Sequence, residues 1–454
     1  MTERFDIVIV GARCAGAALA TFLARLGAKV LVVERDRLHS DQVISTHTIH
    51  PPGVAILDEL GVGDTLRSVT PISRRIRLRK GDTWVDISFP PGRQELCPRR
   101  DRLDGLLQDA AMAAGCELRD RTRATRVLFD SDRAVGVEIE HAGSRSEVRA
   151  DLLVGADGRR SSIAQQVGAE EYMAYDAPRA MYWAYWRAPA VWRTASYPFD
   201  MYIGHIGLDA RAIFQTDHDQ LLIGSLPAVA EARHWRKDAL TALKRNLSRD
   251  PATGPLVADS DPISTVRGTL KERYFFRQGT GSGWALVGDA GHHKEFVIGD
   301  GITEALIQAK ALSKAISDGK EESLMHWWRA RDIEALPGYF WGRDEGSLSP
   351  PARLESLIFA RVARDERLQA LMCRLPEHEC SPYDALPIRE VLVALFTGLL
   401  RGGFGVVPEF IAQSRRVAEY KKVLAERKRL LDEVERKGPR TAQRLVAADG
   451  TASS

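Results

Sequence analysis

The stretch FDIVIVGARCAG, residues 5–16, places a run of aliphatic residues directly before a glycine-containing turn. Such a run predicts a buried parallel strand, and the residues after the turn have the spacing of a helix that stops near Gly27. The segment KVLVVER then predicts a second strand that ends at Glu34. A strand, a helix and a strand in this order predict a parallel sheet with helices packed on it.

The turn departs from the dinucleotide-binding pattern G-x-G-x-x-G at one position. Gly11 and Gly16 hold the first and third glycine positions, but Arg13 replaces the second glycine, which normally lets the backbone approach a pyrophosphate. Glu34 lies about 20 residues beyond the turn, where an acid binds ribose hydroxyls. Taken alone, each of these residues also fits an ordinary turn or a solvated strand end.

Two later segments also end a predicted strand in a tight turn. These turns are GADG at 155–158 and GDAG at 288–291, and a second glycine-rich turn and a helix follow the latter. Because ligands of open α/β sheets bind outside the carboxyl ends of the strands, we expect the three turns to share one ligand. Taken alone, Asp157 and Asp289 also fit helix caps or turn residues.

A different pattern separates and follows these segments. Short β-rich runs at 181–188, 200–207, 211–217 and 221–228 predict an inserted antiparallel sheet, which would form a cleft with the nucleotide-binding part. After about residue 304 the pattern is helical, and Phe410, Val417, Leu424 and Leu431 recur every seven residues. This stretch predicts a helix packed on the body or on a partner. Residues 441–454 are predicted to be unstructured.

Charge and composition exclude several classes of protein. The net charge of +3 is evenly spread, so it predicts neither nucleic acid nor an acidic membrane as a partner. The five cysteines lack metal-ligand spacing and predict a reducing compartment and no metal site. Without a signal pattern or a long apolar window, we expect a cytoplasmic protein with no membrane span, and a homodimer stays open.

With these turns in this order, the segment from about residue 5 to residue 315 resembles the single-component FAD-dependent monooxygenases of the para-hydroxybenzoate hydroxylase type. The resemblance implies an α/β fold: a Rossmann-like FAD-binding domain, an inserted antiparallel β-sheet substrate domain and a helical C-terminal region. The implied layout is FAD-binding segments at 1–72, 97–175 and 266–345, substrate-domain segments at 73–96 and 176–265, and a helical region with a disordered tail at 346–454.

The resemblance also implies which residues hold FAD. Gly11 and Gly16 would lie at the pyrophosphate, Glu34 at the adenosine ribose and Asp289 at the ribityl chain. The glycines of the later turn would leave room for the isoalloxazine. The full implied set is Gly11, Arg13, Cys14, Ala15, Gly16, Glu34, Arg35, Arg100, Asp157, Gly158, Asp289, Gly299, Gly301 and Ile302.

For activity, the resemblance implies a hydroxylase in which NAD(P)H reduces FAD transiently and O2 forms a flavin C4a-hydroperoxide. The substrate implied is an aromatic or polyketide-like small molecule. Candidate catalytic residues are His292, His293 and His47, although histidines in such positions also serve structural roles. Candidate substrate-binding residues are Tyr182, Trp186, Tyr202, Phe214 and Phe296, and the aromatic residues of the inserted sheet also fit a hydrophobic core.

Several positions depart from the family pattern. Ser45-Thr46-His47 replaces an arginine beyond the ribose acid, and Phe296 replaces a proline near the isoalloxazine. Glu295 and Asp300 add carboxylates, which we expect to raise the energy of an anionic reduced flavin.

Two alternative functions stay open. One is an FAD-dependent reductase or dehydrogenase acting on a carbon–carbon bond without oxygen insertion, and the other is a non-catalytic flavin-binding scaffold. The halogenase motif W-x-W-x-I-P is absent, and residues 339–342 begin like the isoprenoid-reductase motif Y-x-W-x-F-P but lack its Phe-Pro end.

Overall fold

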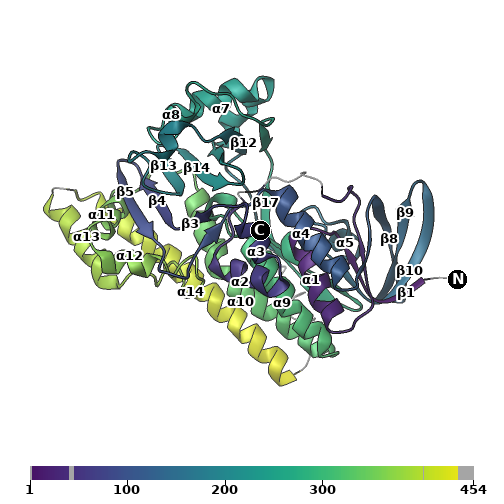
Figure 1. The fold of residues 1–454 in the computed structure, drawn as a ribbon. Coiled ribbons are helices and arrows are strands. Elements are labelled where there is room, and N and C mark those ends of the chain that lie inside the picture. The colour runs from purple at the N-terminus through teal and green to yellow at the C-terminus, as the bar shows by residue number, and fades with distance from the viewer. Residues whose placement is uncertain (1–2, 40–44, 46, 402, 438–454) are drawn as a thin grey trace.

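The computed structural model describes residues 3–39, 45, 47–401 and 403–437 (Figure 1). Thr46 and the predicted unstructured tail lie outside these residues. The described chain forms a parallel-sheet domain, a second and largely antiparallel sheet, and a helical C-terminal region. This arrangement confirms the predicted fold class.

The first sheet is the predicted Rossmann-like sheet. Its strand order is β18-β19-β10-β1-β2-β7, and β1, β2, β7, β10 and β19 run parallel. The bounds are β1 Glu3–Val10, β2 Val30–Val33, β7 Glu117–Arg119, β10 Ser144–Gly155, β18 Thr280–Gly281 and β19 Trp284–Leu286. The aliphatic residues of β1 and β2 are buried on both faces, as continuous apolar runs in a parallel sheet require.

Different elements cover the two faces of this sheet. On one face, small residues of α1 allow close packing with α9, and α2 and α4 join the same core. The other face packs on the antiparallel pair β8 and β9 and on α5. The bounds are α1 Cys14–Arg25, α2 Pro51–Leu60, α3 Gly63–Arg67, α4 Arg100–Ala113, α5 Ser162–Gln166, α9 Gly301–Ser317, β8 Thr122–Asp130 and β9 Arg133–His141.

The second sheet has the order β16-β12-β15-β14-β13-β4-β5. Its bounds are β4 Arg75–Lys80, β5 Thr83–Ser88, β12 Met181–Arg187, β13 Met201–Ile206, β14 Asp209–Thr216, β15 Gln220–Leu226 and β16 Arg267–Thr269. Only β4 and β13 pair in parallel. The outer face packs on α7 (Ala239–Leu247) and α8 (Gly254–Val257), which lie above it in Figure 1, with α6 (Val229–Ala232) beside them.

Small sheets and the C-terminal helices complete the fold. The small sheets are β11 (Glu171–Asp176), β17 (Arg273–Arg277) and β20 (His292–His293), and β3 (Ile72–Ser73) with β6 (Glu95–Leu96). The helices are α10 Glu321–Gly346, α11 Arg353–Val362, α12 Glu366–Met372, α13 Ile388–Leu400 and α14 Val406–Lys437. Tyr420 and Leu424 of α14 pack into the core formed with α10, so the helix with the seven-residue repeat packs on the body. None of the described helices combines the length and apolar composition that crossing a bilayer requires.

Candidate functional site

The three glycine-containing turns meet at one edge of the Rossmann sheet. Strands β1, β10 and β19 are parallel neighbours, so their carboxyl ends lie together. The amide of Ala156 donates to the carbonyl of Val10 at 2.8 Å, and the amide of Val287 donates to the carbonyl of Gly155 at 3.0 Å. The turns are therefore joined through backbone contacts, as a shared ligand site requires.

Steric contact explains the glycines of the first turn. Gly11 has a φ of 107°, and a Cβ there would lie 2.4 Å from the carbonyl oxygen of Ala156. A Cβ at Gly16 would lie 1.9 Å from the carbonyl oxygen of Gly11. Both positions therefore exclude side chains, and the amides of Cys14, Ala15 and Gly16 lie in the first turn of α1.

Arg13 turns its side chain toward the end of β2. Its Nη2 lies 3.0 Å from Oδ2 of Asp36, and both side chains are partly buried. Both oxygens of Glu34 are also engaged nearby: Oε2 accepts from the amide of Ala12 at 2.8 Å, and Oε1 accepts from the amide of Asp36 at 3.0 Å. The structure therefore places Glu34 directly beside the first turn, whereas Arg35 is exposed at the surface.

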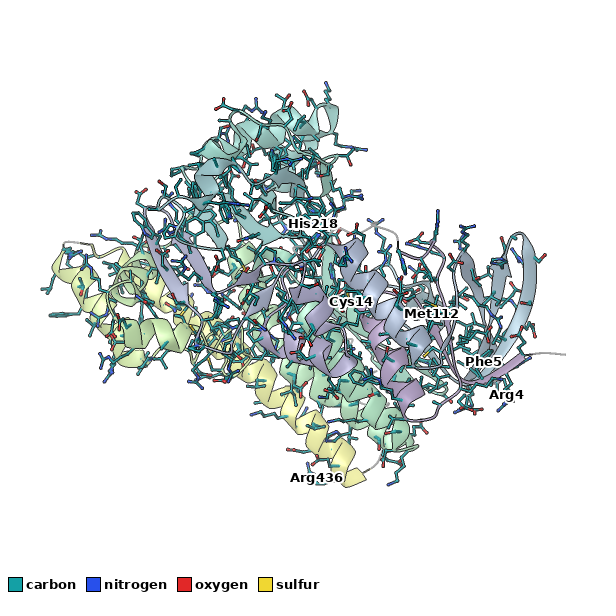
Figure 2. The ribbon with its side chains drawn as sticks, viewed as in Figure 1. Arg4, Phe5, Cys14, Met112, His218 and Arg436 are labelled. Carbon is teal, nitrogen blue, oxygen red and sulfur yellow. The ribbon has the colours of Figure 1, made fainter. Side chains whose placement is uncertain are left out.

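Arg100 is a buried cation beside the start of α1. Its Nη2 donates to Asp104 at 2.9 Å and contacts Sγ of Cys14 at 3.4 Å, while its Nε has no hydrogen-bond partner among the described residues. Figure 2 labels Cys14 at the start of α1, in the middle of the molecule. Burial raises the pKa of the Cys14 thiol, which donates to Asp104 at 3.1 Å. Cys14 is therefore a neutral packing residue, and Arg100 retains an unused donor.

Asp289 is the partly exposed end of a chain of charged residues, and its side chain is 40% exposed. His293 lies between Asp289 and Glu272, with its ring nitrogens 3.5 Å from each carboxylate, and Glu272 also pairs with Arg159 at 2.7 Å. Burial opposes the charge on His293, but the two carboxylates outweigh it and raise the pKa to about 9. The same histidine outweighs burial at Asp289 and lowers the pKa of that carboxyl. His293 therefore orients Asp289.

Asp157 has a local structural role in the second turn. Its Oδ2 accepts from the amide of Ser162 at 2.7 Å, and its Oδ1 accepts from the hydroxyl of Ser161. These bonds cap the turn that starts α5. Gly158 has a φ of 80°, a conformation that favours glycine, and a Cβ there would meet no atom within 4 Å.

The turn at 296–301 lies between β20 and α9. Gly299 has a φ of 70°, and a Cβ added to Gly301 would meet nothing within 4 Å, so open space lies in front of the first residue of α9. Ile302 is buried in the Rossmann core. Phe296 packs between hydrophobic clusters, while Val297 and Ile298 line the cavity described below. Phe296 itself is partly buried and does not line this cavity, although the two residues after it do.

Of the two extra carboxylates at this turn, Asp300 is paired with cationic or hydrogen-bonding side chains and Glu295 is partly protonated at pH 7. Asp300 accepts from Nζ of Lys294 at 2.6 Å and from Nε2 of His378 at 2.9 Å. Burial raises the pKa of Glu295 to about 7, although a hydrogen bond from Tyr274 opposes this shift. These contacts reduce the negative charge that Glu295 and Asp300 were expected to place near the flavin.

His292 and His47 are both buried histidines with fixed partners. Nδ1 of His292 lies 3.1 Å from Glu304, its ring packs against Phe276 with centroids 4.3 Å apart, and burial lowers its pKa. His47 has a φ of 68° and bonds the carbonyl of Ser45 through Nδ1 at 2.9 Å. Burial, followed by the charge of Arg100, lowers the pKa of His47 to about 3. Both rings are therefore neutral at pH 7.

A cavity of about 930 Å³ extends from the 297–300 turn to the C-terminal helices. Its apolar lining comes from Ile76, Leu78, Ile87 and Ile203 of the second sheet, Val297 and Ile298 of the turn, and Leu354, Ile358, Leu386 and Val391 of the helical region. Its polar lining includes His50, Lys80, Glu95, His205 and Asp300. A largely apolar cavity with a few polar groups is typical of a small-molecule site.

The cavity lies on the inner face of the second sheet, whereas three of the predicted substrate-binding residues lie on its outer face. Tyr182, Trp186 and Tyr202 pack into the core under α7 and α8, because strand alternation directs them to the outer face. Their predicted role in binding substrate is therefore corrected. Phe214 is on the inner face but is buried in the core beneath the cavity, 2% exposed.

Sequence reasoning missed one buried pair at the cavity wall. Nδ1 of His50 lies 2.8 Å from Oε1 of Glu95, and the amide of His50 donates to the hydroxyl of Thr303 at 2.9 Å. Burial opposes the charge of His50, but Glu95 outweighs it and raises the pKa to about 9. The only sequence signal is the position of His50 directly before Pro51-Pro52, which start α2.

A family described as FAD binding domain matches residues 4–322. The chain belongs to this family. The residues at the site fit the cofactor, because Arg100 Nε is an unused buried donor and Gly301 faces open space. When bound, FAD supplies the redox chemistry, and the chain is an FAD-dependent oxidoreductase.

The proteins to which the chain is similar are named for different activities. The chain is 26% identical over 377 residues to digeranylgeranylglycerophospholipid reductase 2 of Methanopyrus kandleri, which covers 80% of this chain and 88% of the relative. It is 28% identical over 193 residues to squalene monooxygenase of Mus musculus and 25% identical over 197 residues to tetracenomycin B2 monooxygenase-dioxygenase of Streptomyces olivaceus. These two alignments cover 38% and 36% of this chain and 34% and 35% of the relatives.

Solved structures share the fold. The p-nitrophenol 4-monooxygenase of Pseudomonas putida has a TM-score of 0.68 at 16% identity, with 84% of this chain and 100% of that chain covered. A flavoprotein/dehydrogenase from Cytophaga hutchinsonii has a TM-score of 0.71 at 16% identity, with 84% and 94% covered.

Proposed function

We propose that the chain is an FAD-dependent monooxygenase that uses NAD(P)H and O2 to hydroxylate a bulky, largely apolar small molecule. The observation that supports this most directly is the cavity of about 930 Å³ that reaches the 297–300 turn. A volume of this order accommodates a drug-sized ligand. The relatives named for squalene and tetracenomycin act on molecules of this general size, which agrees with the cavity.

In this proposal FAD is held at the three turns. The amides of α1 and the guanidinium of Arg100 bind the pyrophosphate, Glu34 the adenosine ribose and Asp289 the ribityl chain. His293 keeps Asp289 ionised and correctly oriented. The glycines at 299 and 301 let the backbone approach the flavin ring.

The cavity residues orient the substrate and exclude water. Ile203, Val297 and Leu354 belong to three different elements and surround the cavity with apolar surface. His50, held by Glu95, presents a protonated imidazolium at the end nearest the turn. Its Nε2 makes a long contact of 3.4 Å with the carbonyl oxygen of Ile298, and it would donate to an oxygen of the substrate in place of that contact.

The proposal is tested by loading the purified protein with FAD and screening bulky apolar compounds. Substrate-dependent NADH or NADPH oxidation, matched O2 uptake and the appearance of labelled oxygen in the product from isotopic O2 are the expected results. NAD(P)H oxidation that yields only peroxide with every compound, or product without labelled oxygen, contradicts it.

The second candidate is an FAD-dependent reductase of carbon–carbon double bonds. It is favoured by the Methanopyrus kandleri reductase, whose alignment extends over 80% of this chain. An anaerobic incubation with reduced flavin and a polyunsaturated isoprenoid separates the two functions. Saturation of the double bonds without O2 supports the reductase, and dependence on O2 supports the monooxygenase.

A further inference from the structure

An apolar face on α13 and the start of α14 is exposed at one end of the molecule. Figure 1 shows α11, α12 and α13 gathered at this end, on the far side of β5 from the Rossmann domain. The face is formed by Ile388, Leu392, Val393, Phe396, Leu400, Phe404, Val407 and Ile411, whose exposed fractions range from 38% to 78%. Within α13 the spacing of 388, 392, 396 and 400 places these side chains on one side of the helix.

The inward side of α13 is already packed. Ala394 is fully buried, and a Cβ added to Gly398 would lie 2.7 Å from Cγ1 of Val406. Val391 and Leu395 join the core beneath the second sheet. The packing of α13 on the body is therefore complete without the exposed apolar side chains. A contiguous exposed apolar surface of this kind marks an interaction site.

The exposed charges on the helical segment that carries this face are all positive. Within the described residues 388–401 and 403–415, the exposed charged side chains are Arg389, Arg401 and Arg415. The two acids of the segment are held by local partners: Glu390 binds Arg361 and also pairs with Arg389 at 3.1 Å, and Glu409 accepts from the amide of Leu354 at 2.7 Å. Arg401 and Arg415 therefore supply most of the positive charge. Apolar residues bordered by arginines match the interface of an anionic bilayer, where acyl chains lie beneath negative headgroups.

We propose that this face, residues 388–401 and 403–411 with its bordering arginines, docks the protein on an anionic lipid surface. A second copy of the chain is less favoured as the occupant, because the same segment of the partner would offer exposed arginines and no exposed acid to pair with them. The sequence, whose charges are evenly spread, did not predict this basic border. The border depends on which charged side chains of α13 and α14 are exposed in the folded protein.

The inner side of the same helical layer lines the cavity. Leu386 and Val391 line it, as do Leu354 and Ile358 of the neighbouring α11. One layer of helices thus separates the proposed lipid contact from the proposed substrate site. An apolar substrate would be concentrated in the bilayer beside its cavity. Only this statement about the substrate rests on the proposed function.

The test is sedimentation of the FAD-loaded protein with vesicles of phosphatidylcholine, with or without phosphatidylglycerol. We expect binding to the anionic vesicles that weakens with salt. The triple variant Arg389→Gln, Arg401→Gln, Arg415→Gln should weaken binding by about fivefold per arginine. The triple variant Phe396→Ser, Leu400→Ser, Phe404→Ser should abolish it. Phe129→Ser, at an exposed phenylalanine of β8 that is 46% exposed, is the matched control and should bind normally.

Three results would overturn the proposal. These are no binding to either vesicle, equal loss of binding in Phe129→Ser, or a dimer in sedimentation equilibrium that the serine triple variant dissociates. The assay needs no turnover, so failure to oxygenate any compound leaves its result intact. Unchanged flavin loading and unfolding midpoints show that the variants are folded.

Discussion

The hydroxyl of Tyr185 donates a hydrogen bond to Nε2 of His47, whose Nδ1 is bound to the carbonyl of Ser45. The two bonds fix one neutral tautomer of a fully buried ring. Arg99 lies over the ring of Tyr185 at 4.6 Å, so the pair connects the inner face of the second sheet to the start of α4. His47, which stands where the family pattern has an arginine, is thus neutral and links the FAD-binding part to the second sheet through Tyr185.

Removing this hydroxyl should destabilise the protein. Tyr185→Phe leaves Nε2 of His47 buried without its donor, which costs about 1–3 kcal/mol in the free energy of unfolding. Tyr182→Phe is the matched control, since Tyr182 lies on the same strand but on the opposite face. Urea denaturation of both variants measures the difference, and equal midpoints would contradict a role for the bond.

Two glycines should respond oppositely to alanine. Gly16→Ala would place a Cβ 1.9 Å from the carbonyl oxygen of Gly11, so we expect loss of the folded protein. Gly301→Ala meets no atom within 4 Å, and its apo form should be as stable as the parent or slightly more so. We expect Gly301→Ala to weaken FAD binding by about tenfold or more because the methyl group occupies the flavin's space. Fluorescence titration with FAD measures this, and unchanged affinity would place the flavin elsewhere.

Glu34 should contribute mainly to FAD affinity. Glu34→Ala removes the proposed acceptor for the ribose and the acceptor for the amides of Ala12 and Asp36, and charged hydrogen bonds are worth about 1.5–3 kcal/mol. We therefore expect FAD affinity to fall by about 10–100-fold. Glu34→Gln should lose less, because the amide oxygen still accepts one bond. Glu117→Gln, at an exposed acid of the neighbouring β7, is the control and should bind FAD normally.

The outcome at individual residues shows what the sequence could predict. The spacing of Gly11, Glu34 and Asp289 predicted one shared site, because strand order brings the ends of parallel strands together. Alternation along β12 places Tyr182 and Trp183 on opposite faces of the second sheet. It could not say which face lies over the site, since that depends on how β13 joins β4 across a long separation in sequence. Paired charges such as Asp300 with His378 likewise depend on tertiary contact.

Narrowing the cavity should impair substrate binding without loss of flavin. Ile203→Phe enlarges a side chain that lines the cavity on β13. We expect the KM for a bulky substrate to rise by about tenfold or more, because overpacking a filled site costs about 1–3 kcal/mol. Leu208→Phe, in the exposed turn after the same strand, is the control. Steady-state kinetics and the flavin absorbance measure the two effects, and a KM unchanged by Ile203→Phe would contradict this location of the substrate.

Buried ionisable residues predict a stability maximum near pH 6.5. Burial lowers the pKa of His47 and His205 to about 3. Below pH 6.5 the unfolded chain therefore binds protons that the folded chain does not, and the free energy of unfolding decreases as the pH is lowered. Burial raises the pKa of Glu295 to about 7, so between about pH 4.5 and 6.5 the folded chain holds a proton on Glu295 that the unfolded chain lacks. This proton offsets one of the two protons that the histidines bind in the unfolded chain. His50 and His293, whose pKa values are raised to about 9 by carboxylates that outweigh burial, lose their contribution as pH rises from 6.5 to 9.

Single variants should change one side of this profile at a time. Each group contributes a slope of up to about 1.4 kcal/mol per pH unit. His205→Gln should flatten the acid side, because Glu295 offsets the remaining His47, and leave the alkaline side unchanged. His50→Gln should reduce the slope on the alkaline side by about half, because His293 remains, and leave the acid side unchanged. Urea denaturation of the apo protein from pH 5 to pH 9 measures the profile without contributions from FAD. A profile that rises steadily to pH 9, or that both variants alter on the same side, would contradict the charges assigned to these histidines, because opposite protonation states must respond to pH with opposite sign.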